Sequence, residues 1–111
     1  GKTKKFIENN AMQEYIRCFS KKNAIHASCE DYRAAATIDI LHHKLDKGKK
    51  IDCPILVLWG KHSTIQKLYN PLKIWRKWAK NVSGFSLNCG HFLAEESPKE
   101  LYEAVQGFFR K

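Results

Sequence analysis

The chain has 111 residues, 43% of them hydrophobic and 28% charged, a composition typical of one small globular domain. No apolar run approaches the ~20 residues of a membrane span, and the polar first residues do not resemble a secretory signal, so we expect a cytoplasmic protein that does not enter the membrane. The formal net charge is +9, but lysine and arginine are spread over every segment. Solvated helix faces explain such a charge, and nucleic-acid binding is not predicted.

The first half of the sequence favours helices. Residues 6–19 place apolar side chains on one side of a helix, and the polar residues 20–23 break it. A short helical turn is expected around residues 24–27. Ser28 can then cap a long helix over residues 29–45, whose first turn carries two acidic residues, where negative charge suits the helix dipole.

The second half predicts strands that alternate with helices. Residues 55–59 form a continuous apolar run, typical of a strand buried on both faces in a parallel sheet. A helix is expected over residues 71–80, because asparagine suits the cap before it and proline suits its first position. After a polar link at residues 81–84, a second apolar run covers residues 85–87. Two parallel strands need neighbours on both edges, so we expect that part of the sheet lies outside this chain.

The segment at residues 88–98, Asn-Cys-Gly-His-Phe-Leu-Ala-Glu-Glu-Ser-Pro, organises the second half. It places His91 on the loop at the C-terminal end of a strand, where α/β sheets carry their chemistry. Ser97 with Glu100 is typical of a capping box, and Pro98 of a first helical position. The helix that follows has an apolar stripe of Leu101, Val105, Phe108 and Phe109. A purely structural histidine is the alternative, but the glycine before His91 and the capped helix after it favour a functional one.

The cysteines do not predict a metal site. Cys18, Cys29, Cys53 and Cys89 include no C-x-x-C pair and have no histidine at a zinc-like spacing. Each lies in or beside an apolar run, so we expect buried, reduced thiols. We expect no cofactor.

Several of these segments together resemble a known family. Gly-His-Phe, followed by Glu-Glu and Pro, is similar to the last catalytic motif of the α/β-hydrolase superfamily. Residues 29–39, 54–60 and 71–79 add a resemblance to the C-terminal third of the haloacetate (fluoroacetate) dehalogenases. The resemblance covers roughly residues 8–110.

The resemblance implies an α/β fold in which this chain is a C-terminal fragment. Residues 1–45 would be the end of the helical cap and its return to the core. Residues 46–111 would be the last two strands of the core, parallel and followed by their helices in the order β-α-β-α.

The resemblance also implies roles for two residues. In the family, an aspartate carboxylate attacks the carbon that bears the halogen, and a histidine then activates water to cleave the resulting ester. His91 takes the position of that general base. Tyr32 matches a cap tyrosine that donates a hydrogen bond to the departing halide, and a packing tyrosine with its hydroxyl at the surface is the alternative. The loop at residues 61–64, Lys-His-Ser-Thr, has no acid, which agrees with haloacetate dehalogenases and not with typical epoxide or haloalkane hydrolases.

The nucleophile, the orienting acid and the arginines that hold the substrate carboxylate are expected outside this chain. None of its aspartates precedes a helix in the strand-turn-helix elbow that a nucleophile requires, so the chain alone is expected to be inactive. A small haloacid is the expected substrate of the complete enzyme, and the missing N-terminal half or a second copy is the expected partner. Two alternatives remain: a non-catalytic remnant stabilised by self-association, and a fragment of an epoxide or ester hydrolase of the same superfamily.

Overall fold

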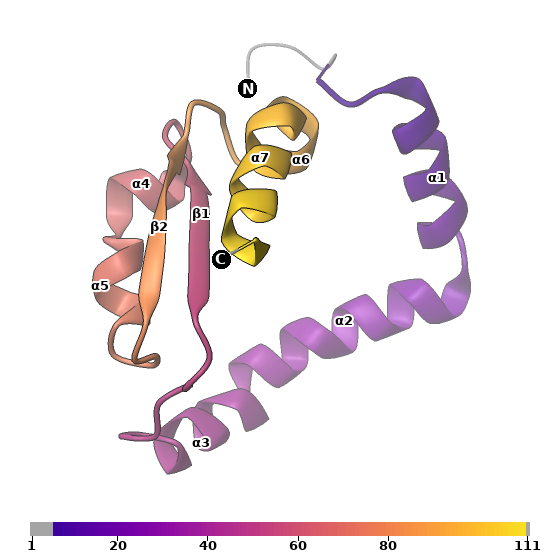
Figure 1. Cartoon of the computed structure of the whole chain (residues 1–111). Helices are drawn as coiled ribbons and strands as arrows, with labels where there is room; N and C mark the ends of the chain where they lie inside the picture. The colour runs from indigo at the N-terminus through magenta and orange to yellow at the C-terminus, as the bar shows by residue number, and fades with distance from the viewer. Residues whose placement is uncertain (1–5, 111) are drawn as a thin grey trace. The chain divides into compact units, whose positions relative to one another are not determined.

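The computed structural model describes residues 6–110. Its elements in order are α1 (Asn9–Phe19), α2 (Lys22–Ala36), α3 (Ile38–Leu45), β1 (Ile55–Gly60), α4 (Thr64–Leu68), α5 (Pro71–Trp75), β2 (Val82–Leu87), α6 (Leu93–Glu96) and α7 (Pro98–Phe109) (Figure 1). The chain divides into two compact units, one of residues 7–47 and one that joins Phe6 to the part from Gly48 onward. None of the helices in the described residues is long and apolar enough to cross a membrane.

The first unit consists of α1, α2 and α3, and its middle helix begins earlier than predicted. The prediction that Ser28 caps a helix beginning at Cys29 is wrong, because α2 already begins at Lys22. Ser28 lies inside it, where its hydroxyl donates to the carbonyl of Ala24 at 2.9 Å. A serine that bonds the carbonyl four residues earlier is satisfied within a helix and does not need to start one.

The long helix predicted up to residue 45 is interrupted at Thr37. Its backbone angles, φ −131° and ψ −91°, are not helical, and they separate α2 from α3. The Thr37 hydroxyl donates to the carbonyl of Arg33 at 2.7 Å, and its N–H donates to the carbonyl of Ala34 at 3.0 Å. Such local bonds compete with the regular helical ladder, and here they accompany its end.

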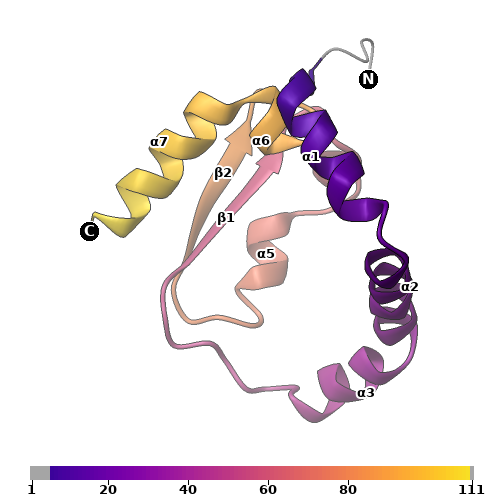
Figure 2. The same cartoon turned by 90° about the vertical axis from the view of Figure 1, so that its right-hand side faces the viewer.

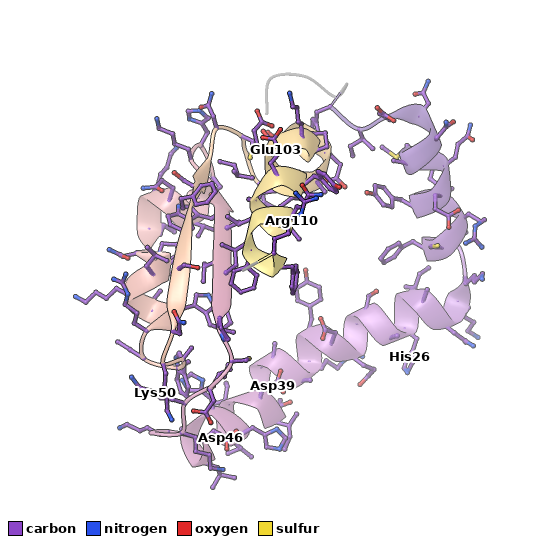
Figure 3. The ribbon with its side chains drawn as sticks, viewed as in Figure 1. His26, Asp39, Asp46, Lys50, Glu103 and Arg110 are labelled. Carbon is purple, nitrogen blue, oxygen red and sulfur yellow. The ribbon has the colours of Figure 1, made fainter. Side chains whose placement is uncertain are left out.

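None of the residues of α1, α2 or α3 is buried. Figure 3 shows their side chains and labels the polar His26 and Asp39 among them. The exposed large apolar side chains of this unit are Met12, Tyr15, Ile16, Phe19, Ile25, Tyr32, Ile38, Ile40, Leu41 and Leu45. So many exposed apolar residues are typical of a surface that another polypeptide covers.

The second unit contains a two-stranded parallel sheet, as predicted. β1 pairs with β2 in a register that runs from Ile55 opposite Val82 to Gly60 opposite Leu87. Figures 1 and 2 show α7 on one face of the sheet and α5 on the other. This helix-covered parallel sheet confirms the α/β fold class.

Two elements of this unit differ from the prediction because of backbone pairing. α5 ends at Trp75 instead of near residue 80, and the backbone after it turns to bond Ile51. The N–H of Ile51 donates to the carbonyl of Trp78 at 2.8 Å, and the N–H of Lys80 donates to the carbonyl of Ile51 at 3.0 Å. The N–H groups of residues 76–79 still bond carbonyls of α5, and the backbone pairs with Ile51 from Trp78 onward. In the loop predicted after β1, Ser63 caps the short helix α4.

β2 begins at Val82, so the polar link predicted at residues 81–84 is mostly strand. Gly84 makes this pairing feasible, because its φ is +156° and a Cβ there would lie 2.0 Å from the carbonyl oxygen of Val57. A larger residue would push the two strands apart. The glycine that indicated a loop is therefore required by the sheet.

Among the described residues, the buried apolar side chains are few: Val57, Pro71, Ala79, Leu87 and Cys89. The prediction of four buried thiols holds for Cys89 alone, since Cys18 is half-buried and both Cys29 and Cys53 are exposed. The apolar runs beside Cys29 and Cys53 are themselves exposed, so they offer these thiols no interior. All four thiols are free.

Candidate functional site

The C-terminal ends of β1 and β2 lie side by side, and their loops are bonded to each other. The N–H of Lys61 donates to the carbonyl of Leu87 at 2.8 Å, and the N–H of His62 donates to the carbonyl of Cys89 at 3.0 Å. The ring of His62 adds a third link, with Nε2 2.9 Å from Oδ1 of Asn88. Backbone hydrogen bonds between the two segments therefore continue beyond the strands, as far as Cys89.

Gly60, the last residue of β1, lies directly beneath the His91 loop. A Cβ at Gly60 would lie 1.6 Å from the carbonyl oxygen of Gly90 and 2.9 Å from that of Cys89. Real Cβ atoms do not approach backbone this closely, so a residue without a side chain is required. The close approach fixes the height of the loop above the strand.

On its other side the loop is held by Glu96, the last residue of α6. The N–H of Gly90 donates to Oε2 of Glu96 at 2.6 Å, and the N–H of Phe92 donates to Oε1 at 3.0 Å. The bond from Gly90 and, to a smaller degree, the bond from Phe92 lower the pKa of the Glu96 carboxyl from its ordinary value. The carboxylate thus bonds the residues immediately before and after His91.

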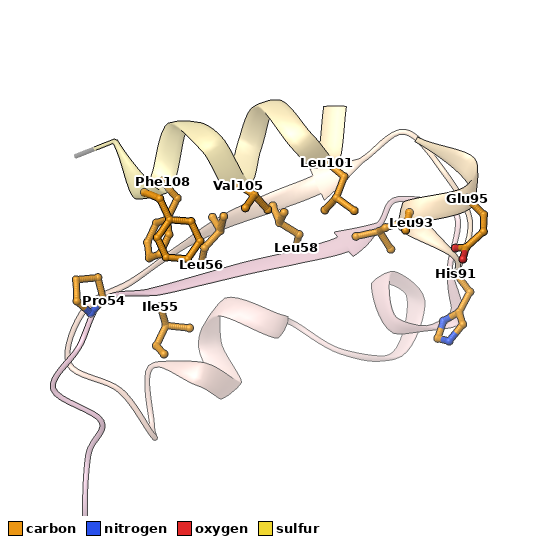
Figure 4. A pocket seen from close by; sticks show the side chains of 12 residues that line it. Pro54, Ile55, Leu56, Leu58, His91, Leu93, Glu95, Leu101, Val105 and Phe108 are labelled. Carbon is orange, nitrogen blue, oxygen red and sulfur yellow. The ribbon is translucent and has the colours of Figure 1, made fainter. Parts of the chain in front are cut away.

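His91 itself is exposed at this edge of the sheet. Figure 4 shows it with Glu95 at the arrowhead end of β1. Its ring meets Phe92 edge-on, with 5.2 Å between centroids, and Phe92 in turn stacks on Phe6 at 5.6 Å. An imidazole in this position can exchange protons with a molecule bound at the strand ends.

A groove of about 660 Å³ runs from His91 along the sheet, between β1 and α7 (Figure 4). Leu56 and Leu58 point into it from the strand, while Leu101 and Val105 point into it from the helix. Packed protein interiors leave few voids larger than a water molecule. We therefore interpret most of this groove as an incompletely packed interface between α7 and the sheet. We interpret only its His91 end as part of the site.

Behind the loop, Ser97 and Cys89 form a buried pair, with 6% and 5% of their surfaces exposed. Burial raises the pKa of the Cys89 thiol, and a hydrogen bond from Ser97 works in the opposite direction. The predicted capping box is wrong, because the Ser97 side chain makes no cap bond to α7. Its hydroxyl is engaged by Cys89 instead. Pro98 does occupy the first position of the helix, as predicted.

Tyr32, the other predicted site residue, lies on α2 with 81% of its surface exposed. It belongs to the first unit and His91 to the second, so neither unit brings the two together by itself. Among the described residues, no group of three or more His, Cys, Asp or Glu could hold a metal ion.

Sequence reasoning did not find the residues that hold the loop. His62 carries no motif, and its role follows from its contact with Asn88. Glu96 was part of the Glu-Glu pair that carried the resemblance, but nothing in that pair indicated which carboxylate turns back. The two glycines, Gly60 and Gly90, were visible as strand and motif ends, and their contact was not.

Two solved structures resemble this chain over nearly its whole length. A protein from Nostoc sp. PCC 7120 assigned as an α/β hydrolase superposes with a TM-score of 0.91 and 54% identity, over 98% of this chain and 38% of its own. A Pseudomonas aeruginosa protein assigned as an epoxide hydrolase gives a TM-score of 0.85 and 33% identity, over 96% of this chain and 36% of its own. This chain is related to the α/β hydrolases.

Two curated relatives are also similar to this chain. Fluoroacetate dehalogenase from a Burkholderia species is 32% identical over 97 residues, which are 87% of this chain and 32% of that enzyme. Soluble epoxide hydrolase from Corynebacterium sp. strain C12 is 31% identical over 98 residues, 86% of this chain and 32% of that enzyme. The predicted resemblance to fluoroacetate dehalogenase is confirmed. This chain spans about a third of the length of these relatives, and no family model matches it.

Proposed function

We propose that His91 is the general base of an α/β hydrolase that works through a covalent ester, and that this chain supplies the base to a site completed by polypeptide outside it. The observation that carries the proposal is the placement of an exposed imidazole at the C-terminal ends of two parallel strands, on a loop bonded from both sides. This is the edge of an α/β sheet at which ligands bind.

His91 and His62 both lie at this edge of the sheet, but their rings have different surroundings. The ring of His62 is engaged by Asn88 at 2.9 Å and ties two loops together. The ring of His91 extends from a loop whose own backbone is already satisfied by Glu96. His62 is therefore suited to holding the edge, and His91 to taking a proton.

The proposed reaction has two steps. In the first, an aspartate carboxylate outside this chain attacks the carbon that bears the halogen, and halide leaves with the bonding electron pair. In the second, His91 takes a proton from water while the water oxygen attacks the ester carbonyl. The ester bond then breaks, the aspartate is regenerated, and the imidazolium returns its proton to the departing alkoxide.

The described aspartates support a nucleophile from elsewhere. Asp31 lies within α2 and Asp39 in the first turn of α3, while Asp46 ends that helix. Asp52 pairs with Lys80 at 2.5 Å. None of these four stands at a strand-to-helix elbow, so the chain alone should release no halide.

The loop after β1 favours a haloacid over an epoxide as the substrate. Its residues 61–64 contain no carboxylate, and two of them have structural tasks: His62 bonds Asn88, and Ser63 caps α4. We also propose that Tyr32 donates a hydrogen bond to the leaving halide, because an exposed phenol on a helix with no buried residues is free to face a substrate. An epoxide hydrolase is the second candidate, supported by the relative from Corynebacterium.

A chimera tests the proposal. The chain replaces the matching 97-residue segment of the Burkholderia fluoroacetate dehalogenase, and fluoride release from fluoroacetate is followed. His91→Gln should lower turnover by about 10²-fold or more, the usual contribution of a general base. His26→Gln is the matched control, because His26 is an exposed histidine of α2 whose ring lies 4.0 Å from Glu30. An active chimera that loses no activity with His91→Gln would contradict the proposal.

A further inference from the structure

Glu96 uses both of its carboxylate oxygens on backbone. Oε2 accepts from the N–H of Gly90 and Oε1 from the N–H of Phe92, the two residues that flank His91. Hydrogen bonds to an ionised carboxylate are shorter and stronger than those between neutral groups, and the first of these measures 2.6 Å. One side chain therefore fixes the loop at two points, with His91 between them.

We propose that Glu96 is a positioning residue for His91, a role that rests on the function proposed above. Both carboxylate oxygens are bonded to backbone, so we assign Glu96 no contact with the substrate. It restricts the direction in which the His91 side chain leaves the backbone, because the Cys89–Gly90 and His91–Phe92 peptide planes are both bonded to the same carboxylate. A general base must be held near its water, and a displacement of 1 Å can lower a rate by about 10²-fold.

The neighbouring residues are matched to this arrangement. A Cβ at Gly90 would lie 2.7 Å from each oxygen of Glu96, so only glycine lets the carboxylate reach the backbone here. Beneath it, the carbonyl of Gly90 rests against Gly60 at the end of β1. The loop is thus enclosed between the strand end on one side and Glu96 on the other. Each contact depends on a residue without a side chain.

Glutamate is better suited to the task than its close analogues. A glutamine at position 96 offers one acceptor oxygen for two N–H donors, and its own N–H₂ group would face the second donor. An aspartate keeps the charge but is one methylene shorter. The two backbone bonds also lower the pKa of Glu96, so the carboxylate stays ionised throughout the neutral range.

The first experiment tests the contact by NMR on the 111-residue chain. The amide protons of Gly90 and Phe92 are followed as the pH falls from neutral to below the ordinary glutamate pKa of 4.5. Both signals should shift upfield together, with a common midpoint below 4.5, because protonation of Glu96 weakens both bonds. In Glu96→Gln this shared titration should disappear. In the control Glu103→Gln, an exposed glutamate of α7, it should remain (Figure 3).

The second experiment tests the positioning role in the chimera, where ester formation and ester hydrolysis are measured separately. Glu96→Gln should keep the initial burst of halide and slow ester hydrolysis by roughly tenfold to 10²-fold, as expected for a displaced base. Glu96→Asp should retain part of the hydrolysis rate. The proposal is overturned if the amides of Gly90 and Phe92 do not titrate together, or if they do and ester hydrolysis in Glu96→Gln keeps its wild-type rate. A failure of the general-base proposal itself is recognised separately, since His91→Gln would then leave hydrolysis unchanged.

Discussion

Replacement of Gly60 by alanine should be among the most destabilising single changes in this chain. The new Cβ would lie 1.6 Å from the carbonyl oxygen of Gly90 and 2.6 Å from its carbon, and an ordinary contact requires at least 3.4 Å. Because both atoms belong to backbone, no side-chain rotation relieves the overlap, and the His91 loop must move away from β1. That movement also strains the bonds from Lys61 and His62 to Leu87 and Cys89.

The magnitude follows from these two effects. Overpacking of a filled site costs about 1–3 kcal/mol, and each of the two backbone bonds contributes about 0.5–1.5 kcal/mol. We therefore expect a loss of about 2–6 kcal/mol in the free energy of unfolding, measured by urea titration of circular dichroism. Gly107→Ala in α7 is the control: a Cβ there meets nothing within 4 Å, so alanine should stabilise the helix by about 0.5–1 kcal/mol. A Gly60→Ala chain as stable as wild type, within about 0.5 kcal/mol, would refute the packing of the His91 loop on β1.

Three further predictions concern the halide, the association state and the buried thiol. In the chimera, Tyr32→Phe should slow halide release by removing a donor worth roughly 1–3 kcal/mol, while Tyr69→Phe should not; equal rates would exclude the halide role. The chain alone should sediment as a dimer or larger species, because association would bury its exposed apolar side chains and pair its two open strand edges. A compact monomer at low micromolar concentration would contradict this. Exposed Cys29 and Cys53 should react quickly with a thiol reagent and Cys89 slowly. Burial raises the pKa of the Cys89 thiol in the folded chain above its ordinary value of 9.0. The contribution of this thiol to stability should therefore be complete below pH 9.0 and be lost as the pH rises from 9.0 through the higher folded pKa. The unfolding midpoint of Cys89→Ala should accordingly vary less with alkaline pH than that of wild type.

The sequence predicts the second unit better than the first for a physical reason. Continuous apolar runs such as residues 55–59 indicate a buried parallel strand wherever they occur, and the structure forms β1 there. Proline and asparagine before α5 act locally, so the start of that helix was also predictable. Its end at Trp75 was not, because it depends on pairing with Ile51, more than twenty residues away.

The helical unit, residues 7–47, was predicted less accurately. Serine and threonine are ambiguous, because each occurs both at helix ends and inside helices. Ser28 is a residue type that often caps a helix, but its hydroxyl bonds within α2. Thr37 was expected inside a long helix, but it lies at the end of α2. The site was predictable only in part for a similar reason. The position of His91 follows from the strand before it, whereas the carboxylate that holds its loop depends on a turn of α6 that the sequence does not indicate.

Intact-protein mass spectrometry of the His91→Gln chimera shows whether His91 hydrolyses an ester that another residue forms. With the base removed, the first step still proceeds, so with fluoroacetate one fluoride should be released per site and the protein should gain the mass of a carboxymethyl group on its nucleophilic aspartate. Wild-type chimera should show no such adduct at steady state if hydrolysis outpaces ester formation. A His91→Gln chimera that turns over steadily without a trapped ester, or one that releases no halide at all while wild type is active, would contradict the role assigned to His91.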